Sequence, residues 1–462
     1  MTSFVVLCVL LGLGHLLRSR IKLLHKLYLP SCVIGGLVGL LMIQLFSAGS
    51  SGGCAVCVSA DSWLGTVTEP WRKLPSMLIN VVFACLFLGV KIPKLSDLWK
   101  RSGPQVVYGQ IVAWGQYVVG LGLWVLVLGK IFTDLPGMFA GILPVGFEGG
   151  HGTAAGMGPV FAEHGWAEGQ DLAMTSATCG IMSAIVVGMI LINWAVRKGH
   201  AVKHKELTEQ VEDDSIAIVD PEQRPIAGRL TVNSDIIEAF SLHLVVVGLA
   251  CGIGLLIKEG LVLIESQSAY LTDHKLLSSF PLFPLCMIGG LIIQLLFDKY
   301  DRRKHIDLGL IRRIQNCSLD FLVVAAIAMI SIDVVKTAWL PLAILVAAGI
   351  IWNVFCVTTL ARRILPDAWF ERAIAEMGQS MGVTATGLLL LRVVDPDYDT
   401  PAADAFACKQ IVHEPVMGGG LWTSAAIPLI AIYGPWRVLM IATGAISFWL
   451  VVGWLMRIKK TV

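Results

Sequence analysis

The sequence contains little charge for its length. Asp, Glu, Lys and Arg make up 15% of its 462 residues, whereas soluble domains contain about 25%. Apolar residues make up 56%, and the mean hydropathy is +0.75. This composition excludes an ordinary soluble domain and predicts an all-α polytopic membrane protein. No nucleic-acid partner is predicted.

Several functional signatures are also missing. No basic segment precedes the apolar stretch 4–17, and Arg18 and Arg20 follow it, so no cleavable signal peptide is expected. There is no ATP-binding P-loop, which argues against primary active transport by this chain. His413-Glu414-Pro415-Val416-Met417 lacks the second His of zinc proteases, and nothing resembles a repeated channel selectivity filter. We therefore expect neither an enzyme nor a cofactor.

Cysteine offers no clear metal site. Of 11 Cys residues, Cys54 and Cys57 stand in a polar loop, while the others lie in apolar segments, where they pack as small hydrophobic side chains. Without a second Cys pair nearby, a tetrahedral zinc site is not predicted. A local disulfide and two free thiols remain alternatives for Cys54 and Cys57.

A spanning helix needs about 20 mainly apolar residues, and the sequence predicts about 10–11 such helices. They lie near residues 3–17, 28–48, 75–90, 104–131, 171–196, 236–257, 280–297, 317–335, 338–360, 403–430 and 435–456. Two further segments, 137–162 and 367–393, are too rich in Gly, Pro and polar residues for continuous spans. We predict them to be re-entrant or broken helices. Backbone that is not helical at membrane depth must be buried in protein or line a wet cavity.

The charge pattern predicts an orientation. Most of the 35 Lys and Arg residues fall in the loops near 18–27, 91–103, 197–235, 298–315, 361–372 and 457–460. By the positive-inside rule these loops are cytoplasmic. The prediction is therefore a multi-pass protein of the inner (cytoplasmic) membrane, with its N-terminus outside and its C-terminus inside.

The two halves of the chain contain a matched motif. Pro30-Ser31-Cys32-Val33-Ile34-Gly35-Gly36-Leu37 and Pro284-Leu285-Cys286-Met287-Ile288-Gly289-Gly290-Leu291 agree at six of eight positions. One motif runs outward and the other inward, which predicts two inverted-topology repeats. The predicted organisation is a transmembrane repeat at 1–196, a cytoplasmic linker at 197–235, an inverted repeat at 236–434 and an additional helix at 435–462.

The first broken segment carries residues suited to binding. Gly149, Gly150 and Gly152 allow close backbone approach, and Thr153 could cap the helix that follows. Exposed N–H groups at such a helix end favour an anion such as a carboxylate. His151 could donate to that carboxylate, or it could hold the loop by bonding to backbone.

The second broken segment offers similar groups. Its turn and hydroxyls predict that substrate is bound by Gln379, Ser380, Gly382, Thr384 and Thr386. Unwound carbonyls and hydroxyl oxygens also suit Na⁺, a hard cation. Hydrogen bonding of the threonines back to their own helix is the structural alternative.

Ionisable residues inside a membrane are costly, so each suggests a function. Glu148 and Glu376 occupy corresponding places at the two breaks, where they could bind a cation, carry a proton or face interfacial water. Asp320 is a further candidate cation ligand, with a position at the membrane surface as the alternative. Glu414 completes the set of ion-coupling candidates.

Three basic residues also lie near these segments. Lys409 and His413 are one helical turn apart, and with Glu414 they form either a polar pathway or a buried network. Arg392 could neutralise a substrate carboxylate or lie at the membrane surface.

The motif Gly149-Gly150-His151-Gly152-Thr153 resembles the sodium/glutamate symporter family, as do the segments Phe161-Ala162-Glu163-His164-Gly165-Trp166 and Ala173-Met174-Thr175-Ser176-Ala177-Thr178-Cys179-Gly180. The resemblance implies two inverted five-helix domains, each with a re-entrant segment, and Na⁺-coupled uptake of glutamate. This chain differs from the family at Glu148, where the family has a small residue. Arg392, Lys409, His413 and Glu414 have no counterpart in the family that we can place.

Together these observations predict a Na⁺-coupled symporter of glutamate or a similar small carboxylate that works by alternating access. Na⁺ is the expected coupling ion, and its ligands are left open. A homodimer is one possible assembly of the chain. The alternative is an H⁺-coupled transporter of another organic anion or amino acid, with the proton carried by Glu148 or Glu376.

Overall fold

The computed structural model describes residues 1–22, 24, 29–51, 63–91, 95–202, 224, 226–274, 277–301, 303–395 and 399–461. Across these residues it contains helices and turns and no strand. Seven of the described helices are long and apolar enough to cross a membrane. The prediction of an all-α polytopic membrane protein is confirmed. Cys54, Cys57 and most of the predicted linker lie outside the described residues.

The helices follow one another along the two halves of the chain. The first half contains α1 (Thr2–Arg20), α3 (Ser31–Ser51), α5 (Leu74–Ala84), α6 (Leu95–Leu123), α7 (Gly129–Ile131), α8 (Ile142–Gly146), α9 (Gly150–Gly156), α10 (Gly158–Glu163) and α11 (Gly169–Arg197). The second contains α13 (Ala239–Ser266), α14 (Ala269–His274), α15 (Leu282–Tyr300), α16 (Leu308–Ala328), α17 (Ile332–Thr337), α18 (Trp339–Phe355), α19 (Ala361–Ile364), α20 (Trp369–Met381), α21 (Thr384–Val394), α22 (Ala402–His413), α23 (Leu421–Tyr433) and α24 (Pro435–Thr461).

Both segments predicted to be broken are interrupted in the structure. The first consists of a 3₁₀ turn, α8, α9 and α10, and the second consists of α20 and α21, separated by Gly382 and Val383. Val383 is extended, and α21 has no side-chain cap at its N-terminus. At each break one helix therefore ends and another begins, and the backbone groups between them lie outside the regular helical hydrogen-bond pattern.

The prediction of one continuous span at 403–430 is wrong. The helix stops at His413, and α23 begins only at Leu421. Pro415, two residues after His413, has no N–H to continue the helix. Its carbonyl instead accepts a hydrogen bond from the Leu421 N–H at 2.8 Å. The chain thus contains a third interruption, at 414–420.

Two other predicted boundaries also shift. The predicted span 317–335 is replaced by α16, which begins earlier because Asp307 accepts a hydrogen bond from the Leu310 N–H at 3.0 Å and caps the helix. A separate helix, α17, follows from Ile332. The predicted span 75–90 ends early, since α5 stops at Ala84.

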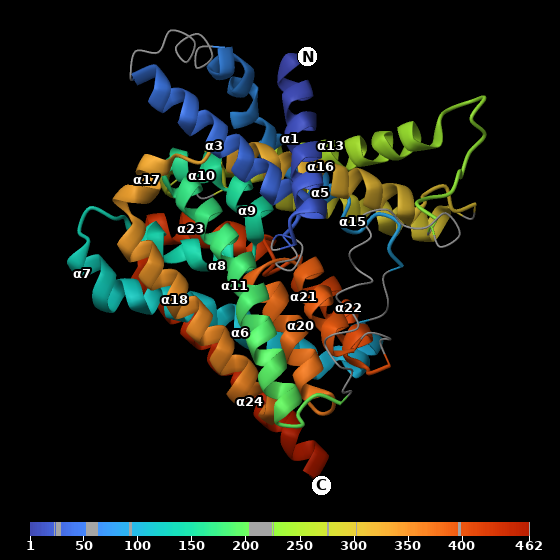
Figure 1. The fold of residues 1–462 in the computed structure, drawn as a ribbon. Coiled ribbons are helices and arrows are strands. Elements are labelled where there is room, and N and C mark those ends of the chain that lie inside the picture. Colours follow the sequence, from blue (N-terminus) through green and yellow to red (C-terminus); the bar gives the residue numbers. More distant parts are fainter. Residues whose placement is uncertain are drawn as a thin grey trace. The chain divides into compact units, whose positions relative to one another are not determined.

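The chain forms two compact units, and each draws on both predicted repeats. Unit 1 contains residues 1–92, 155–159 and 215–330, and unit 2 contains residues 93–154, 160–214 and 331–462. The labels in Figure 1 allow the helices of each unit to be followed along the chain.

In unit 1 the two copies of the matched motif pack in the same way. A Cβ at Gly35 would lie 2.5 Å from the Leu10 carbonyl of α1, and one at Gly289 would lie 2.1 Å from the Ala250 carbonyl of α13. The next glycine of each motif faces a helix from the other half of the chain: Gly36 meets α16, and Gly290 meets α5. Absent side chains at these positions let the backbones approach closely.

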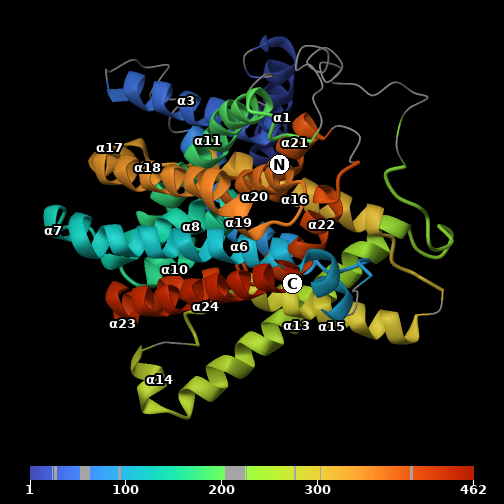
Figure 2. The ribbon, with the colours of Figure 1, turned by 90° about the horizontal axis from the view of Figure 1, so that it is seen from below.

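In unit 2 three long helices pack together. Helix α6 packs against both α18 and α24, and these three lie side by side (Figure 2). Helix α22 also packs on α6, and α20 packs on α11 and α21. Large apolar side chains stay exposed on α24, for example Trp454 (61% exposed), as expected of a lipid-facing surface.

Close packing of α20 against α21 gives the first testable prediction. A Cβ at Gly387 would lie 2.4 Å from the Ala375 carbonyl and 2.9 Å from the Phe406 ring. We expect Gly387→Ala to lower the free energy of unfolding by about 1–3 kcal/mol, because α20 and α21 must move apart to make room for the methyl group. Thermal unfolding in detergent measures this change. Gly444→Ala is the matched control, since a Cβ there meets nothing within 4 Å; equal stability of the two variants would contradict the packing argument.

Candidate functional site

The two interrupted segments meet inside unit 2. Gly150 begins α9 with a φ of +67°, which a residue with a side chain rarely adopts. A Cβ there would lie 3.1 Å from Val383 and 3.4 Å from the Gly382 carbonyl. The breaks at 147–150 and 382–383 are therefore neighbours, and the helices α9 and α21 both begin at this point.

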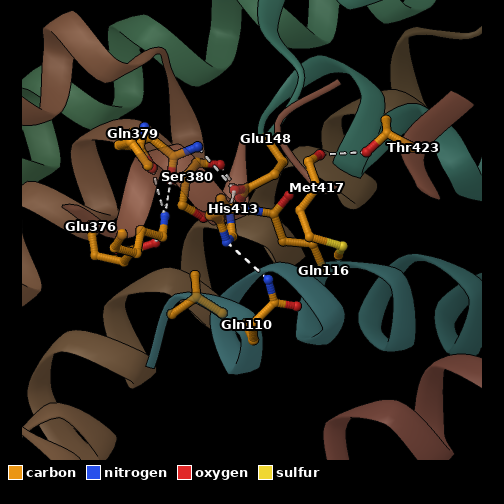
Figure 3. A network of polar contacts seen from close by, with 12 residues as sticks. Gln110, Gln116, Glu148, Glu376, Gln379, Ser380, His413, Met417 and Thr423 are labelled. Atoms are coloured by element: carbon orange, nitrogen blue, oxygen red, sulfur yellow. Dashed lines mark hydrogen bonds and ion pairs between the residues drawn. The ribbon is translucent and has the colours of Figure 1, made fainter. Parts of the chain in front are cut away.

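Glu148 projects from the first break into a buried polar cluster (Figure 3). Its Oε1 accepts hydrogen bonds from His413 Nε2 at 2.5 Å and from Gln379 Nε2 at 2.9 Å. Its Oε2 is buried and has no hydrogen-bond partner among the described residues. One half of this carboxylate is therefore held in place while the other has an unused acceptor.

Glu376, one helical turn before Gln379 on α20, is the second carboxylate of the cluster. Its Oε1 lies 2.6 Å from Lys409 Nζ, and its Oε2 accepts from Gln105 Nε2 at 3.0 Å. Lys409 also donates to Gln379 Oε1 at 3.1 Å and to Gln410 Oε1 at 2.9 Å. Both side chains of the Lys409–Glu376 pair are fully buried, with 0% of each exposed. In a low-dielectric interior each of these charges requires the other.

The hydrogen bonds around His413 favour its neutral form. Trp114 Nε1 can only donate, and it lies 3.0 Å from Gln110 Oε1, so this bond orients the Gln110 amide. The Gln110 NH₂ group then faces His413 Nδ1 at 3.3 Å, which makes Nδ1 the acceptor and places the proton on Nε2. A second ring proton on Nδ1 would face the NH₂ donor, so this arrangement favours the neutral imidazole as the donor to Glu148.

The charges of the cluster do not cancel. Glu148 and Glu376 contribute two negative charges, Lys409 contributes one positive charge, and His413 is neutral in this arrangement. One negative charge is left over, and the unpartnered Oε2 of Glu148 belongs to it. A buried carboxylate of this kind attracts a cation or a proton.

The remaining predicted residues of the second break lie around this cluster. Ser380 is buried and donates to Asn353 Oδ1 at 3.0 Å, while its own Oγ and carbonyl accept from Gln116 Nε2. Thr384 accepts from Gln410 Nε2 at 2.5 Å, Gly382 forms the turn, and Thr386 is buried in α21. The five residues Gln379, Ser380, Gly382, Thr384 and Thr386 therefore lie at one place, and their role in substrate binding remains a prediction.

In the first break, neither His151 nor Thr153 has the local structural role considered from the sequence, and their role in substrate binding remains a prediction. His151 Nε2 lies 3.0 Å from the Thr178 hydroxyl of α11, so the imidazole contacts a side chain rather than the backbone carbonyl considered above. Thr153 lies inside α9 and not at its N-cap, so the expected capping role is wrong. Its buried Oγ1 has no hydrogen-bond partner among the described residues. Gly149, in the turn before α9, and Gly152, inside it, lie at the same break.

Three other predicted residues are not part of the cluster as described. Asp320 lies in unit 1, where it neighbours Cys32. Glu414 is the residue that follows α22 and is only partly buried, and Arg392 is exposed in the last turn of α21. The structure therefore brings Glu148 and Glu376 together and leaves Asp320 outside this unit.

Sequence reasoning did not identify the glutamines of α6. Gln105, Gln110 and Gln116 are buried and contact Glu376, His413 and Ser380, in that order. Gln105 and Gln116 are 11 residues apart, which places them on one face of the helix. The sequence feature that could have identified them is the presence of three amide side chains in an otherwise apolar span.

The neutral His413 gives a second prediction. We expect His413→Leu to lower the free energy of unfolding by about 1.5–3 kcal/mol, because it removes a donor to a buried carboxylate. His413→Gln should lose less, since its NH₂ group can reach the position of Nε2. Thermal unfolding of both variants in detergent measures the difference, and equal losses would mean that the donor to Glu148 is not what matters.

Comparison with known proteins identifies one family. The family model described as sodium/glutamate symporter matches residues 1–398. The match includes both breaks and both buried carboxylates, and it ends before Lys409 and His413. The chain matches no curated protein and no solved structure. Because the match covers most of its length, the chain belongs to the sodium/glutamate symporter family.

Proposed function

We propose that the protein is a Na⁺-coupled symporter that moves glutamate into the cell across the inner membrane by alternating access. Membership of the sodium/glutamate symporter family supports the coupling ion and the substrate class. The observation that carries the proposal is the excess negative charge at the junction of the two interrupted segments. A transporter driven by a cation gradient needs a site of this kind.

The residues at this junction suit Na⁺. Na⁺ is a hard cation and takes oxygen ligands, as Mg²⁺ and Ca²⁺ do. Within the described part of the chain, the buried Glu148 Oε2 and the buried Thr153 hydroxyl of the same segment have no hydrogen-bond partner. In this proposal Glu148 binds Na⁺ through Oε2 while His413 and Gln379 hold its Oε1.

The start of α21 suits a carboxylate of the substrate. Its N-cap residue, Val383, supplies no side-chain cap, so the first N–H groups of this 11-residue helix are not used by a capping side chain. Such a helix end favours an anion. Bound Na⁺ beside Glu148 would add positive charge at the same junction, so that cation and glutamate bind more tightly together than separately.

Alternating access is supported by the repeated packing of unit 1. The motifs at 30–37 and 284–291 use their two glycines in equivalent ways, and each motif packs against a helix from the other half of the chain. Two inverted copies of one helix set would produce this reciprocity. Inverted repeats allow two related conformations with access from opposite sides.

The third prediction tests transport directly. Purified protein in liposomes should take up labelled L-glutamate when Na⁺ is high outside, and Glu148→Gln should reduce this Na⁺-driven uptake at least about tenfold. Loss of one charge-assisted ligand costs about 1.4 kcal/mol or more, which is a factor of ten in binding. Light scattering of the detergent-purified protein tests whether it forms a homodimer.

The control for this experiment is Glu163→Gln. Glu163 is the exposed carboxylate at the end of α10, so its loss should leave uptake unchanged. Uptake driven equally by K⁺, or by a pH gradient without Na⁺, would reject Na⁺ coupling. A pH-driven result would favour proton transport through Glu148, because both oxygens of Glu376 already accept hydrogen bonds.

A further inference from the structure

Lys409 occupies a site made entirely of oxygen atoms. Its ammonium group has three acceptors: Glu376 Oε1 at 2.6 Å, Gln410 Oε1 at 2.9 Å and Gln379 Oε1 at 3.1 Å. The Phe406 ring also lies near this group, with its centroid 5.9 Å from Nζ. A carboxylate with two amide carbonyls is also a set of ligands that a hard metal cation accepts. We refer to these three atoms as the oxygen cage.

The cage oxygens are oriented by groups other than Lys409. Glu376 is held through its second oxygen by Gln105, at 3.0 Å. The Gln379 amide is held through its NH₂ group by Glu148, at 2.9 Å. The Gln410 amide is held in the same manner by the Thr384 hydroxyl, at 2.5 Å. Because each oxygen has an anchor of its own, the cage should keep its shape when the lysine side chain is removed.

The neighbouring helix leaves room for the lysine. Gly109 of α6 faces the end of the side chain, and a Cβ there would lie 2.5 Å from Lys409 Cε and 2.7 Å from Glu376 Oε1. The space is thus shaped by the absence of a side chain on α6. Lys409 reaches it from α22, which lies beyond the residues matched by the family model.

A purely structural role does not account well for this arrangement. A buried ion pair is often no more stabilising than well-packed apolar side chains, because both charges must leave water. Ionisable groups at membrane depth therefore mark functional sites. The cage also lies at the second break. Gln379 is three residues before the turn at Gly382, and Thr384 is the first residue of the next helix.

We propose that the oxygen cage of Glu376, Gln379 and Gln410 is a monovalent-cation site that the ammonium group of Lys409 fills permanently. This rests on the proposed cation-coupled transport, and it assigns the cage a built-in positive charge in place of a bound Na⁺. The protein then needs Na⁺ only at Glu148. Removal of the lysine side chain creates a second, vacant Na⁺ site.

The experiment measures Na⁺ binding without transport. Thermal unfolding of purified protein is followed in detergent at 1–300 mM NaCl, with choline chloride keeping ionic strength constant. Glu148→Gln serves as the background, because it removes the other proposed Na⁺ site. In this background we expect no Na⁺-specific shift with Lys409 present. Adding Lys409→Ala should produce a rise in the unfolding midpoint of at least about 3 °C with NaCl.

The matched control adds Glu376→Gln to the same variant. It neutralises the cage, so Na⁺ should no longer stabilise the protein. Propylammonium chloride should stabilise the Lys409→Ala variant as NaCl does, since it restores an ammonium group to the cage. Stabilisation by propylammonium but not by Na⁺ would overturn the proposal and leave Lys409 a structural cation.

Folding of the Lys409→Ala variant is informative in itself. Recovery of folded protein in NaCl but not in choline chloride supports a cation site. Failure in both salts, while the variant that also carries Glu376→Gln folds, would show that Na⁺ cannot replace the lysine. None of these results depends on glutamate uptake, so a failure of the proposed transport function is seen separately.

Discussion

The Gln379 amide connects the two buried carboxylates, and the order of the polar cluster depends on it. Its NH₂ group donates to Glu148 and its oxygen accepts from Lys409, so the amide has a single favourable orientation. Reversal would place NH₂ against an ammonium group and oxygen against a carboxylate, and both contacts would be repulsive. Because Gln379 lies three residues before the break at Gly382, the orientation of one side chain couples the helix end to the charges of both segments. A ligand that displaces Glu148 from Gln379 would therefore also disturb Lys409.

The low dielectric constant of the surroundings gives this geometry its consequences. In water, a carboxylate with one unused oxygen would simply be hydrated, whereas in a membrane protein the same oxygen must find a proton, a cation or a donor. The neutral tautomer of His413 then matters greatly. A charged imidazole would balance Glu148, but Trp114 and Gln110 present a donor to the second ring nitrogen and oppose that charge. The excess negative charge follows from a hydrogen-bond chain that begins at an indole on α6.

The sequence predicted the fold class and both interruptions, because these depend on local composition. Gly and Pro in an apolar stretch leave backbone groups that a membrane helix cannot satisfy, wherever the segment packs. The prediction of a continuous span at 403–430 was wrong because the apolar character of the segment outweighed the signal from Pro415 and the glycines that follow it. The cap assigned to Thr153 failed because α9 begins at Gly150. No local pattern could show that Glu148 meets His413, because that contact depends on how α22 packs on α6.

The charge balance of the site depends on α22, which follows the residues matched by the family model. The match ends at residue 398, yet α22 supplies the ammonium group beside Glu376 and the imidazole beside Glu148. Without α22, the matched residues would hold two buried carboxylates and neither of these donors, an arrangement that would need two cations or two protons. With α22 present, one of these charges is met by Lys409 at all times, and only Glu148 depends on what the solution provides. The number of ions that a carrier must bind thus depends on α22 as well as on the two interrupted segments, because the charge balance of a buried site counts every side chain that reaches it.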